Sequence, residues 1–530
     1  MNAKVRLIPL MFAVALSLTG CGGSSGSTTA GLTAPTGLAA TSVSSSEIDL
    51  RWDPVQGAAS YTVYRSSDAN PTATSVATVT DTTYRDSGLF AGTAFNYRVA
   101  TTTLSAPVST TTAAFVANDV RVGDPAVSYG NVEFTADNKY MVWFEQSTDG
   151  SGLGTVWHCT VDPDTGALNP PDGKGYMAFQ STAWGRANPG VDSQGMFYVG
   201  MDRSGNLIMV RPTGPTTGTQ TILSTPPSLY RRAIYPTDLP GGDAYVFWIL
   251  NSDKPGSGYN LASSNGGSYT PVNNSFTLQY ISLADPANIR NVETQGSPTS
   301  VTGTSGIYAP MDFGFARWFQ GKAALSYGAL DSNGYVQVKE CDVDKGCDAD
   351  STDNPPYFIT NDNHSKVDPW TMVFGSSDLI LPGLDATSTS GVYSRASGGT
   401  TMQLAETITP PASELANPAL AQSNQSIVFD GLLYTAYQVD DQGGSFYGTI
   451  TNTGEIWLST VLQSPPTETQ WLISAPTLVD PGVASLAKSE PEPLEGNGKV
   501  WVFYSAVPAG SNFATATWQL LRATTPIGKR

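Results

Sequence analysis

The segment KYMVWFEQ, residues 139–146, is a short apolar run rich in aromatic and β-branched residues, a composition that favours a buried β-strand. Six similar runs follow it: GMFYVGMD (195–202), AYVFWIL (244–250), KAALSYGALD (322–331), DLILPGLD (378–385), GLLYTAYQVD (431–440) and KVWVFYSAV (499–507). Runs of this length, bounded by turn residues, predict strands rather than helices. Their recurrence predicts that one small unit of β-structure repeats along this part of the chain.

A proline precedes each run by 6 to 14 residues. These prolines are Pro125, Pro189, Pro236, Pro310, Pro369, Pro418 and Pro491. Unequal repeats of about 60 residues, built from strands and turns, are typical of a β-propeller with variable loops. The sequence therefore predicts a seven-bladed propeller in which the proline segment enters the innermost strand and the apolar run forms the second strand. Six or eight blades remain alternatives.

The last repeat lacks one strand. After the seventh apolar run only residues 514–524 can form a further strand before the chain ends at Arg530. An open ring would leave two sheet edges unpaired, which proteins avoid. We therefore expect an N-terminal strand within residues 115–122 to complete the last blade and close the ring.

The composition restricts the classes of partner. The 530-residue chain is 40% hydrophobic and only 14% charged, with a formal net charge of -18. This charge opposes binding to nucleic acid and to anionic membrane surfaces, because both would repel it. Neutral glycans, cations and basic proteins remain open as partners.

The N-terminus carries an export motif. Lys4 and Arg6 precede an apolar stretch, residues 7–18, that is too short to span a bilayer and is typical of an export signal. The stretch ends in LTGC (18–21), which resembles the bacterial lipoprotein signal. The resemblance implies that the mature chain begins at Cys21 and is attached by lipid to the cell envelope, in the outer membrane or at the cell surface.

The next segment reads as a small sandwich. Ile48, Leu50 and Trp52 alternate as one strand, and LFAGTAFNYRV (89–99) resembles the motif of fibronectin type III domains. The resemblance implies a spacer or an adhesive module. Phe95 stands where the family has tyrosine, so we expect the corner hydroxyl bond to the backbone to be absent.

These features predict an all-β chain in four parts. The parts are a signal peptide (1–20), a flexible Gly/Ser tether (21–33), a fibronectin type III-like domain (34–114) and a β-propeller domain (115–530).

Histidine and cysteine are scarce. The two histidines, His158 and His364, disfavour a serine triad or a histidine-ligated zinc site, and His158 is expected to be packed within a strand. Outside the cytoplasm, Cys341 and Cys347 are predicted to form a disulfide across a short acidic loop, which leaves Cys159 as a buried thiol.

The same acidic loop raises the question of a metal. Asp342, Asp344 and Asp348 could supply oxygen ligands to calcium. Gly346 stands where an EF-hand type of loop would supply a ligand, and no glutamate closes the set. We therefore predict no cofactor, with calcium at these residues as the alternative.

Three acidic residues directly before prolines are the catalytic candidates. They are Asp124, Asp368 and Glu490, and a residue before proline is pushed towards extended geometry. If the blade entries line a central funnel, the three carboxylates would converge as glycoside hydrolysis requires. This arrangement resembles, loosely, propeller glycosidases whose acids begin inner strands in Asp-Pro contexts. Ordinary turn chemistry is the alternative explanation.

Aromatic residues near the blade entries are the candidates for ligand binding. Trp184, Trp318 and Trp370 lie in loop-like contexts, with Arg186 close to the first of them. Exposed indole faces would stack on sugar rings or on a protein partner. Packing between blades is the alternative.

We expect a lipid-anchored surface protein whose propeller binds an extracellular polysaccharide or a surface protein. The alternatives are a glycoside hydrolase or polysaccharide lyase that uses the funnel carboxylates, and a structural component of the envelope. The expected partners are the membrane, through the lipid on Cys21, and the polysaccharide or protein, with no nucleic acid.

Overall fold

The structure is a computed structural model, and the residues that it describes are 32–43, 47–67, 72–87, 89, 94–112, 120–182, 187–225, 230–251, 275–296, 316–319, 321–366, 370–381, 390–396, 398–408, 418–420, 425–429, 432–441, 449–451, 454–463, 471–473, 477–480, 486–496, 499–512 and 515–525. Within them the regular structure is all β-strand except for one 3-10 turn, η1 (Val343–Lys345). The prediction of an all-β chain is confirmed. A search of these residues finds no helix that could cross a membrane.

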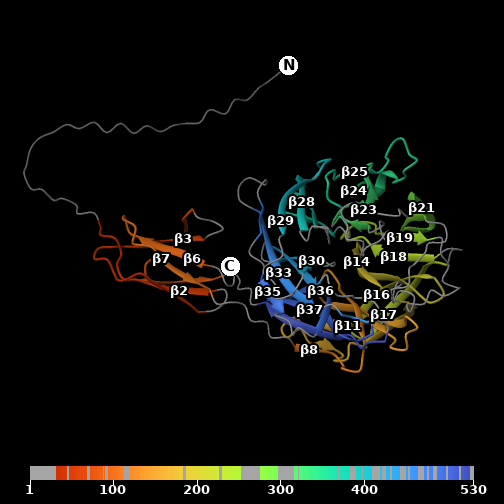
Figure 1. The fold of residues 1–530 in the computed structure, drawn as a ribbon, viewed down its shortest axis with the longest axis horizontal. Coiled ribbons are helices and arrows are strands. Elements are labelled where there is room, and N and C mark those ends of the chain that lie inside the picture. The colour runs from red at the N-terminus through yellow and green to blue at the C-terminus, as the bar shows by residue number, and fades with distance from the viewer. Residues whose placement is uncertain are drawn as a thin grey trace, which may run out of the picture.

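Two sheets form the N-terminal sandwich, drawn in red and orange in Figure 1. One contains β1 (Ala39–Ser42), β2 (Glu47–Arg51) and β5 (Thr83–Ser87) in the order β1-β2-β5; the other contains β3 (Tyr61–Ser67), β4 (Thr74–Val79), β6 (Ala94–Ala100) and β7 (Val108–Thr111) in the order β4-β3-β6-β7. Alternate residues Ile48, Leu50 and Trp52 are buried between them, as the sequence predicted. The sandwich is fibronectin type III-like.

A tyrosine bond anchors the sandwich in place of the missing corner hydroxyl. Phe95 is buried and has no hydroxyl to donate. Two residues on, the buried Tyr97 donates its hydroxyl to Asp86 Oδ2 at 2.8 Å, and Arg65 Nη1 lies 3.0 Å from Asp86 Oδ1. This bond joins β6 to β5 across the sandwich, so the buried carboxylate is fully used by its neighbours.

The remainder of the chain forms seven further sheets, numbered here in chain order. Sheet 1 contains β9 (Tyr129–Phe134), β10 (Tyr140–Gln146), β11 (Leu153–Val161), β12 (Leu168–Asn169) and β13 (Tyr176–Thr182). Sheet 2 contains β14 (Asn188–Asp192), β15 (Gly195–Met201), β16 (Leu207–Gly214) and β17 (Thr217–Ser224). Sheet 3 contains β18 (Tyr230–Pro236), β19 (Tyr245–Asn251), β20 (Ser275–Ser282) and β21 (Asp285–Gly296).

Sheet 4 contains β22 (Ala316–Trp318), β23 (Ala324–Leu330), β24 (Val336–Asp342) and β25 (Tyr357–Phe358). Sheet 5 contains β26 (Trp370–Phe374), β27 (Ser377–Leu381), β28 (Ser390–Ala396) and β29 (Gln403–Ile408). Sheet 6 contains β30 (Pro418–Leu420), β31 (Gln425–Phe429), β32 (Leu432–Asp441), β33 (Gly454–Gln463), β34 (Trp471–Ile473) and β35 (Thr477–Asp480). Sheet 7 contains β36 (Leu486–Gly496), β37 (Lys499–Pro508), β38 (Gln519–Thr525) and β8 (Val120–Val122).

The seven apolar runs of the sequence form corresponding strands in these sheets. They are β10, β15, β19, β23, β27, β32 and β37, each hydrogen-bonded on both sides within its sheet. In β10, Val142 and Phe144 pack into a cluster with residues of sheet 2, whereas Met141 and Trp143 pack into a cluster with residues of sheet 7. Both faces of the strand are therefore buried, which explains why the run is continuously apolar rather than alternating.

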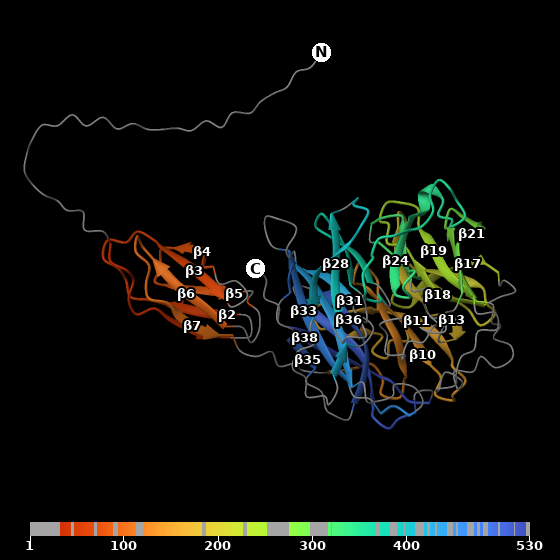
Figure 2. The same ribbon diagram turned by 45° about the horizontal axis from the view of Figure 1, so that its top comes forward.

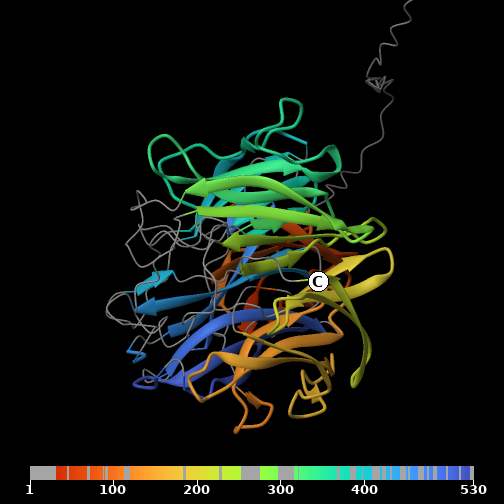
Figure 3. The ribbon, with the colours of Figure 1, turned by 90° about the vertical axis from the view of Figure 1, so that its right-hand side faces the viewer.

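One buried apolar cluster lies between each pair of consecutive sheets. Six clusters join sheets 1 and 2, 2 and 3, 3 and 4, 4 and 5, 5 and 6, and 6 and 7. A seventh joins sheet 7 back to sheet 1, through residues such as Leu494, Trp501 and Tyr129. Figure 3 follows this order in colour, from orange through yellow and green to blue. Figure 2 shows the same body beside the sandwich.

The first and last strands of this region pair with each other. Val122, Arg121 and Val120 of β8 lie opposite Leu520, Leu521 and Arg522 of β38. The side chain of Arg121 also donates to Gln519 Oε1 at 2.6 Å. The strand that the sequence analysis expected to complete the last sheet is therefore β8.

We predict that the apolar contact behind this pairing stabilises the whole region. Leu520→Ala should lower the free energy of unfolding by about 2 to 5 kcal/mol, because Leu520 is fully buried. Val120→Ala in the partner strand is the control and should change it by less than about 0.5 kcal/mol, because Val120 is exposed. Urea titration followed by tryptophan fluorescence measures both. Equal effects of the two substitutions would contradict the prediction.

Candidate functional site

Asp124 is exposed and its carboxylate caps its own turn. Oδ1 accepts a hydrogen bond from the Ala126 amide at 2.8 Å. The Asp124 amide donates to the hydroxyl of Tyr129, which in turn donates to the Asp172 carbonyl, both at 2.8 Å. The Tyr129 ring lies on Trp143 of β10, with ring centroids 4.5 Å apart. Asp124 is thus held beside β10 and the turn before β13, in a conformation typical of Asx turns.

Glu490 lies within β36, the strand at one edge of sheet 7, and is half-buried. Its φ is +53°, so the expectation of extended geometry before Pro491 is wrong for this residue. The cause is a β-bulge: Ser489 and Glu492 pair with Ser505 and Phe503, and two residues oppose Tyr504. The Glu490 amide turns away from β37 and donates to Gln438 Oε1 of sheet 6 at 3.1 Å.

Four predicted residues lie outside the described part of the chain. They are Cys21, Trp184, Arg186 and Asp368. The predicted convergence of three carboxylates therefore has two described members: Asp124 lies in the turn between β8 and β9, and Glu490 lies within β36.

The two described tryptophans of the predicted set are differently placed. Trp318 is buried in the cluster between sheets 3 and 4, where its indole N–H donates to the Tyr235 carbonyl at 3.3 Å. Of the two alternatives, an exposed ring and packing between sheets, Trp318 shows the second, because its ring packs against Tyr245 and Phe247 of sheet 3. Trp370 begins β26, is half-buried and packs against the cluster between sheets 5 and 6.

Sequence reasoning missed Asn131, a residue of β9, which lies at one edge of sheet 1. Its φ is +41°, its side chain is 5% exposed, and its Nδ2 atom is buried without a hydrogen-bond partner. It lies in a bulge where β9 shifts register against β10 between Val142 and Phe144. No sequence motif marks the position, because the bulge depends on the pairing of two strands.

A chain of buried charges joins sheets 4 and 5. Arg395 donates from Nε to Asp378 Oδ2 at 2.9 Å and from Nη2 to Glu340 Oε2 at 2.5 Å. Asp378 also pairs with Lys322, and Glu340 accepts the hydroxyl of Tyr357 at 2.9 Å. Each carboxylate faces a cation, so this cluster has the pattern of a structural link rather than of a general base. Arg395 is itself buried.

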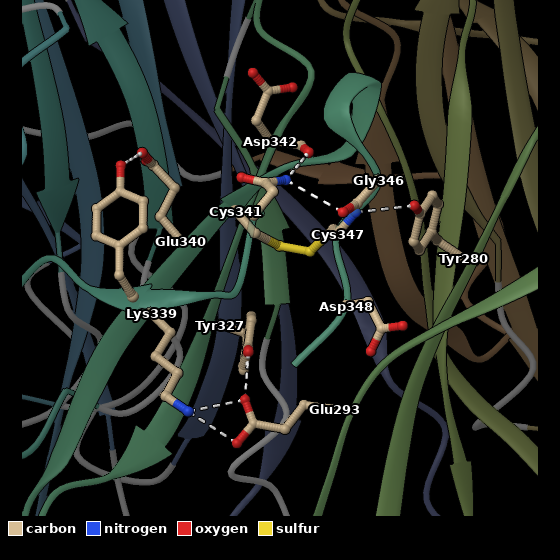
Figure 4. Close-up of a disulfide and its surroundings, with 12 residues drawn as sticks. Tyr280, Glu293, Tyr327, Lys339, Glu340, Cys341, Asp342, Gly346, Cys347 and Asp348 are labelled. Carbon is tan, nitrogen blue, oxygen red and sulfur yellow. Dashed lines mark hydrogen bonds and ion pairs between the residues drawn. A yellow bond between two sulfur atoms is a disulfide. The ribbon is translucent and has the colours of Figure 1, made fainter. Parts of the chain in front are cut away.

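The predicted disulfide between Cys341 and Cys347 is present, with the two Cα atoms 5.6 Å apart (Figure 4). Acidic residues around the disulfide accept hydrogen bonds from the loop itself and from a neighbouring strand. Asp342 accepts the Asp344 amide at 3.0 Å, and Asp344 accepts the hydroxyl of Tyr245. In Figure 4 the carboxyl groups of Asp342 and Asp348 point away from each other. Among the described residues no group of three acidic, histidine or cysteine side chains could hold a metal ion.

His158 is buried between sheets 1 and 2, as predicted for a packed residue. Nε2 lies 3.0 Å from the Gly214 carbonyl, which can only accept, so Nδ1 accepts the Tyr198 hydroxyl at 2.8 Å. Burial lowers the pKa of His158 below its ordinary value of 6.5, and the bond to Gly214 offsets this only in part. Burial likewise raises the pKa of the free thiol of Cys159. Neither residue is available for nucleophilic or acid-base chemistry.

We predict a pH dependence of stability from His158. Its folded-state pKa lies below its unfolded value of 6.5, so the unfolded chain binds the proton more readily as the pH falls below that value. The free energy of unfolding should then fall by up to about 1.4 kcal/mol per pH unit from this residue alone. His158→Gln should remove that contribution. Urea titrations of both proteins between about pH 8 and about pH 5 test this; a parent-variant difference independent of pH would contradict it.

Comparisons with known proteins place only a small part of the chain. No protein-family model matches it. A segment of 66 residues is 46% identical to a poly(3-hydroxybutyrate) depolymerase of Ralstonia pickettii, and this match spans 12% of each chain.

Among solved structures, the fibronectin domain FN3tt is 24% identical, with a TM-score of 0.14, and covers 16% of this chain and 95% of its own. An alpha-L-arabinofuranosidase of Lactobacillus brevis is 9% identical, with a TM-score of 0.31, and covers 64% of this chain and 91% of its own. At these TM-scores the likenesses define neither the fold nor the function of the larger region.

Proposed function

We propose that sheets 1 to 7 are the blades of a seven-bladed β-propeller closed by β8. Three observations support this architecture. Each sheet is built chiefly from consecutive antiparallel strands, each pair of consecutive sheets shares one buried cluster, and the last sheet borrows its outer strand from the start of the region. Closure of this kind removes the two sheet edges that an open array would expose.

We further propose that the chain is anchored by lipid on Cys21 and that the fibronectin type III-like domain holds the propeller away from the membrane. The LTGC motif at residues 18–21 and the apolar stretch before it support the anchor. The Gly/Ser composition of residues 21–33 suits a flexible tether.

Substitution of the proposed lipid acceptor tests the anchor. Cys21→Ser should release the protein from the membrane fraction, because serine has no thiol to carry the lipid. Fractionation of cells and incorporation of labelled fatty acid measure this. Cys159→Ser is the matched control and should leave both unchanged. A Cys21→Ser protein that still carries label and sediments with membranes would contradict the proposal.

The biochemical function we propose is binding of an extracellular polysaccharide or of a surface protein. The observation that carries it is the strained, half-buried Glu490 on the inner strand of sheet 7, while Asp124 is occupied by its own turn. Glycoside hydrolysis needs two carboxylates on either side of one bond, about 5 to 10 Å apart. The placement of Asp124 beside β10 supports binding over hydrolysis. Partial identity to a polymer depolymerase fits a module that works at a polymer surface.

A panel of polysaccharides tests binding against turnover. We expect the parent protein to be retained by at least one polymer without releasing reducing ends, because the Asp124 carboxylate accepts a hydrogen bond from its own turn. Asp124→Ala should bind like the parent, and the double variant Asp124→Ala, Glu490→Ala should bind more weakly. If the parent releases reducing ends and the folded double variant does not, the protein is a glycoside hydrolase instead. Parent turnover that leaves unsaturated sugar ends would identify a lyase.

A further inference from the structure

Two residues of neighbouring inner strands adopt the left-handed conformation in the middle of a strand. They are Asn131 of β9, with φ +41°, and Glu490 of β36, with φ +53°. Among the described residues the one other non-glycine residue with positive φ is Asn138, which lies in the turn between β9 and β10. Asparagine tolerates this conformation, but glutamate pays about 1 to 2 kcal/mol for it. Strain of this kind inside strands gathers at binding sites, where the surrounding structure maintains it.

The two residues lie on either side of the seam that closes the ring of sheets. β36 packs against β9 across this seam. The Ser505 hydroxyl of β37 donates to the Tyr129 carbonyl of β9 at 3.1 Å, which joins the second strand of sheet 7 to β9 beside this seam. Both bulges oppose a residue of the second strand of their sheet, Trp143 in one case and Tyr504 in the other. The same local distortion thus occurs at corresponding positions of two adjacent strands.

The amide of Asn131 has hydrogen-bonding capacity that the described structure does not use. Asn131 is only 5% exposed, and its Nδ2 atom has no hydrogen-bond partner. A buried donor left without a partner costs roughly 1 to 3 kcal/mol. Other polar side chains of the inner strands do find partners: Asn188 donates to the Ile234 carbonyl at 2.7 Å, and Thr371 donates to the Trp318 carbonyl at 2.9 Å.

We propose that Asn131 and Glu490 form a subsite for a neutral, hydroxyl-rich ligand, such as one sugar ring of a polysaccharide. This inference rests on the polysaccharide form of the proposed function. An amide N–H₂ donates to a hydroxyl oxygen and a carboxylate accepts a hydroxyl hydrogen, so the pair suits adjacent hydroxyl groups. The carboxylate of Glu490 and the net charge of -18 disfavour an anionic ligand.

Binding at this subsite requires Asn131 to turn. Nδ2 is closed off from solvent in the described conformation. Because Nδ2 makes no hydrogen bond there, rotation of the side chain breaks none at this atom. A ligand oxygen would therefore accept the hydrogen bond that no protein group accepts from Nδ2. The free energy of this hydrogen bond is gained only in the bound state.

Affinity electrophoresis tests the subsite, with dextran, xylan and laminarin as neutral polymers and alginate as the acidic one. We expect at least one neutral polymer to retard the parent, and Asn131→Gly and Glu490→Gln to bind it about tenfold more weakly, the loss expected for one buried hydrogen bond. Asn138→Gly is the matched control, because it makes the same change at a left-handed asparagine outside the subsite, and it should bind like the parent. Thermal unfolding of each variant verifies the fold. If Asn131→Gly does not fold, Asn131→Asp takes its place in the binding test. Aspartate keeps the shape of the side chain but has an acceptor oxygen in place of the N–H₂ donor.

The outcomes separate this inference from the function on which it rests. If the parent is retarded and both Asn131 variants are retarded equally, the subsite is wrong and the binding function stands. If alginate alone retards the parent, the neutral class of ligand is wrong. If no polymer retards the parent, both the proposed subsite and the proposed binding of a polysaccharide are wrong.

Discussion

The fold of the larger region depends on one constraint: a four-stranded sheet with two apolar faces cannot bury either face by itself. In β10 successive side chains enter two different clusters, one shared with sheet 2 and one with sheet 7. The same holds for β19, where Phe247 packs towards sheet 4 and Trp248 packs towards sheet 2. Every sheet therefore needs a neighbour on both sides, and a linear row would leave its two end faces exposed. The contact of sheet 7 with sheet 1 removes both exposed faces at once.

The same constraint determines what polar groups can do on the inner strands. With both faces buried, a polar side chain there must bond to the next strand or remain unpaired at a cost. Asn188 and Thr371 bond to carbonyls of adjacent inner strands, and the indole N–H of Trp318 does the same towards Tyr235. These side-chain bonds join neighbouring sheets. The Nδ2 atom of Asn131 departs from this pattern, and the proposed subsite rests on that departure.

Much of the fold could be read from the sequence because it rests on local pattern. The apolar runs are central strands of their sheets, since a strand buried on both faces must be continuously apolar. The disulfide of Cys341 with Cys347 follows from their spacing in the chain.

The candidate site was far less predictable, because it depends on contacts between distant residues. Glu490 precedes a proline, which predicts extended backbone, yet pairing with β37 imposes a bulge. Trp318 reads as an exposed loop residue until Tyr235, Tyr245 and Phe247 are placed against it.

The strand β8 is also the part of the larger region that lies nearest in the chain to the N-terminal sandwich. Eight residues separate Thr111, the end of the sandwich, from Val120, the start of β8, so a load on the proposed lipid tether would reach the proposed propeller through β8 first. Three residue pairs join β8 to β38, and the buried contact of Val122 and Leu520 lies behind them. An anchored protein would thus need this apolar contact both to close its ring and to resist the pull of its own spacer.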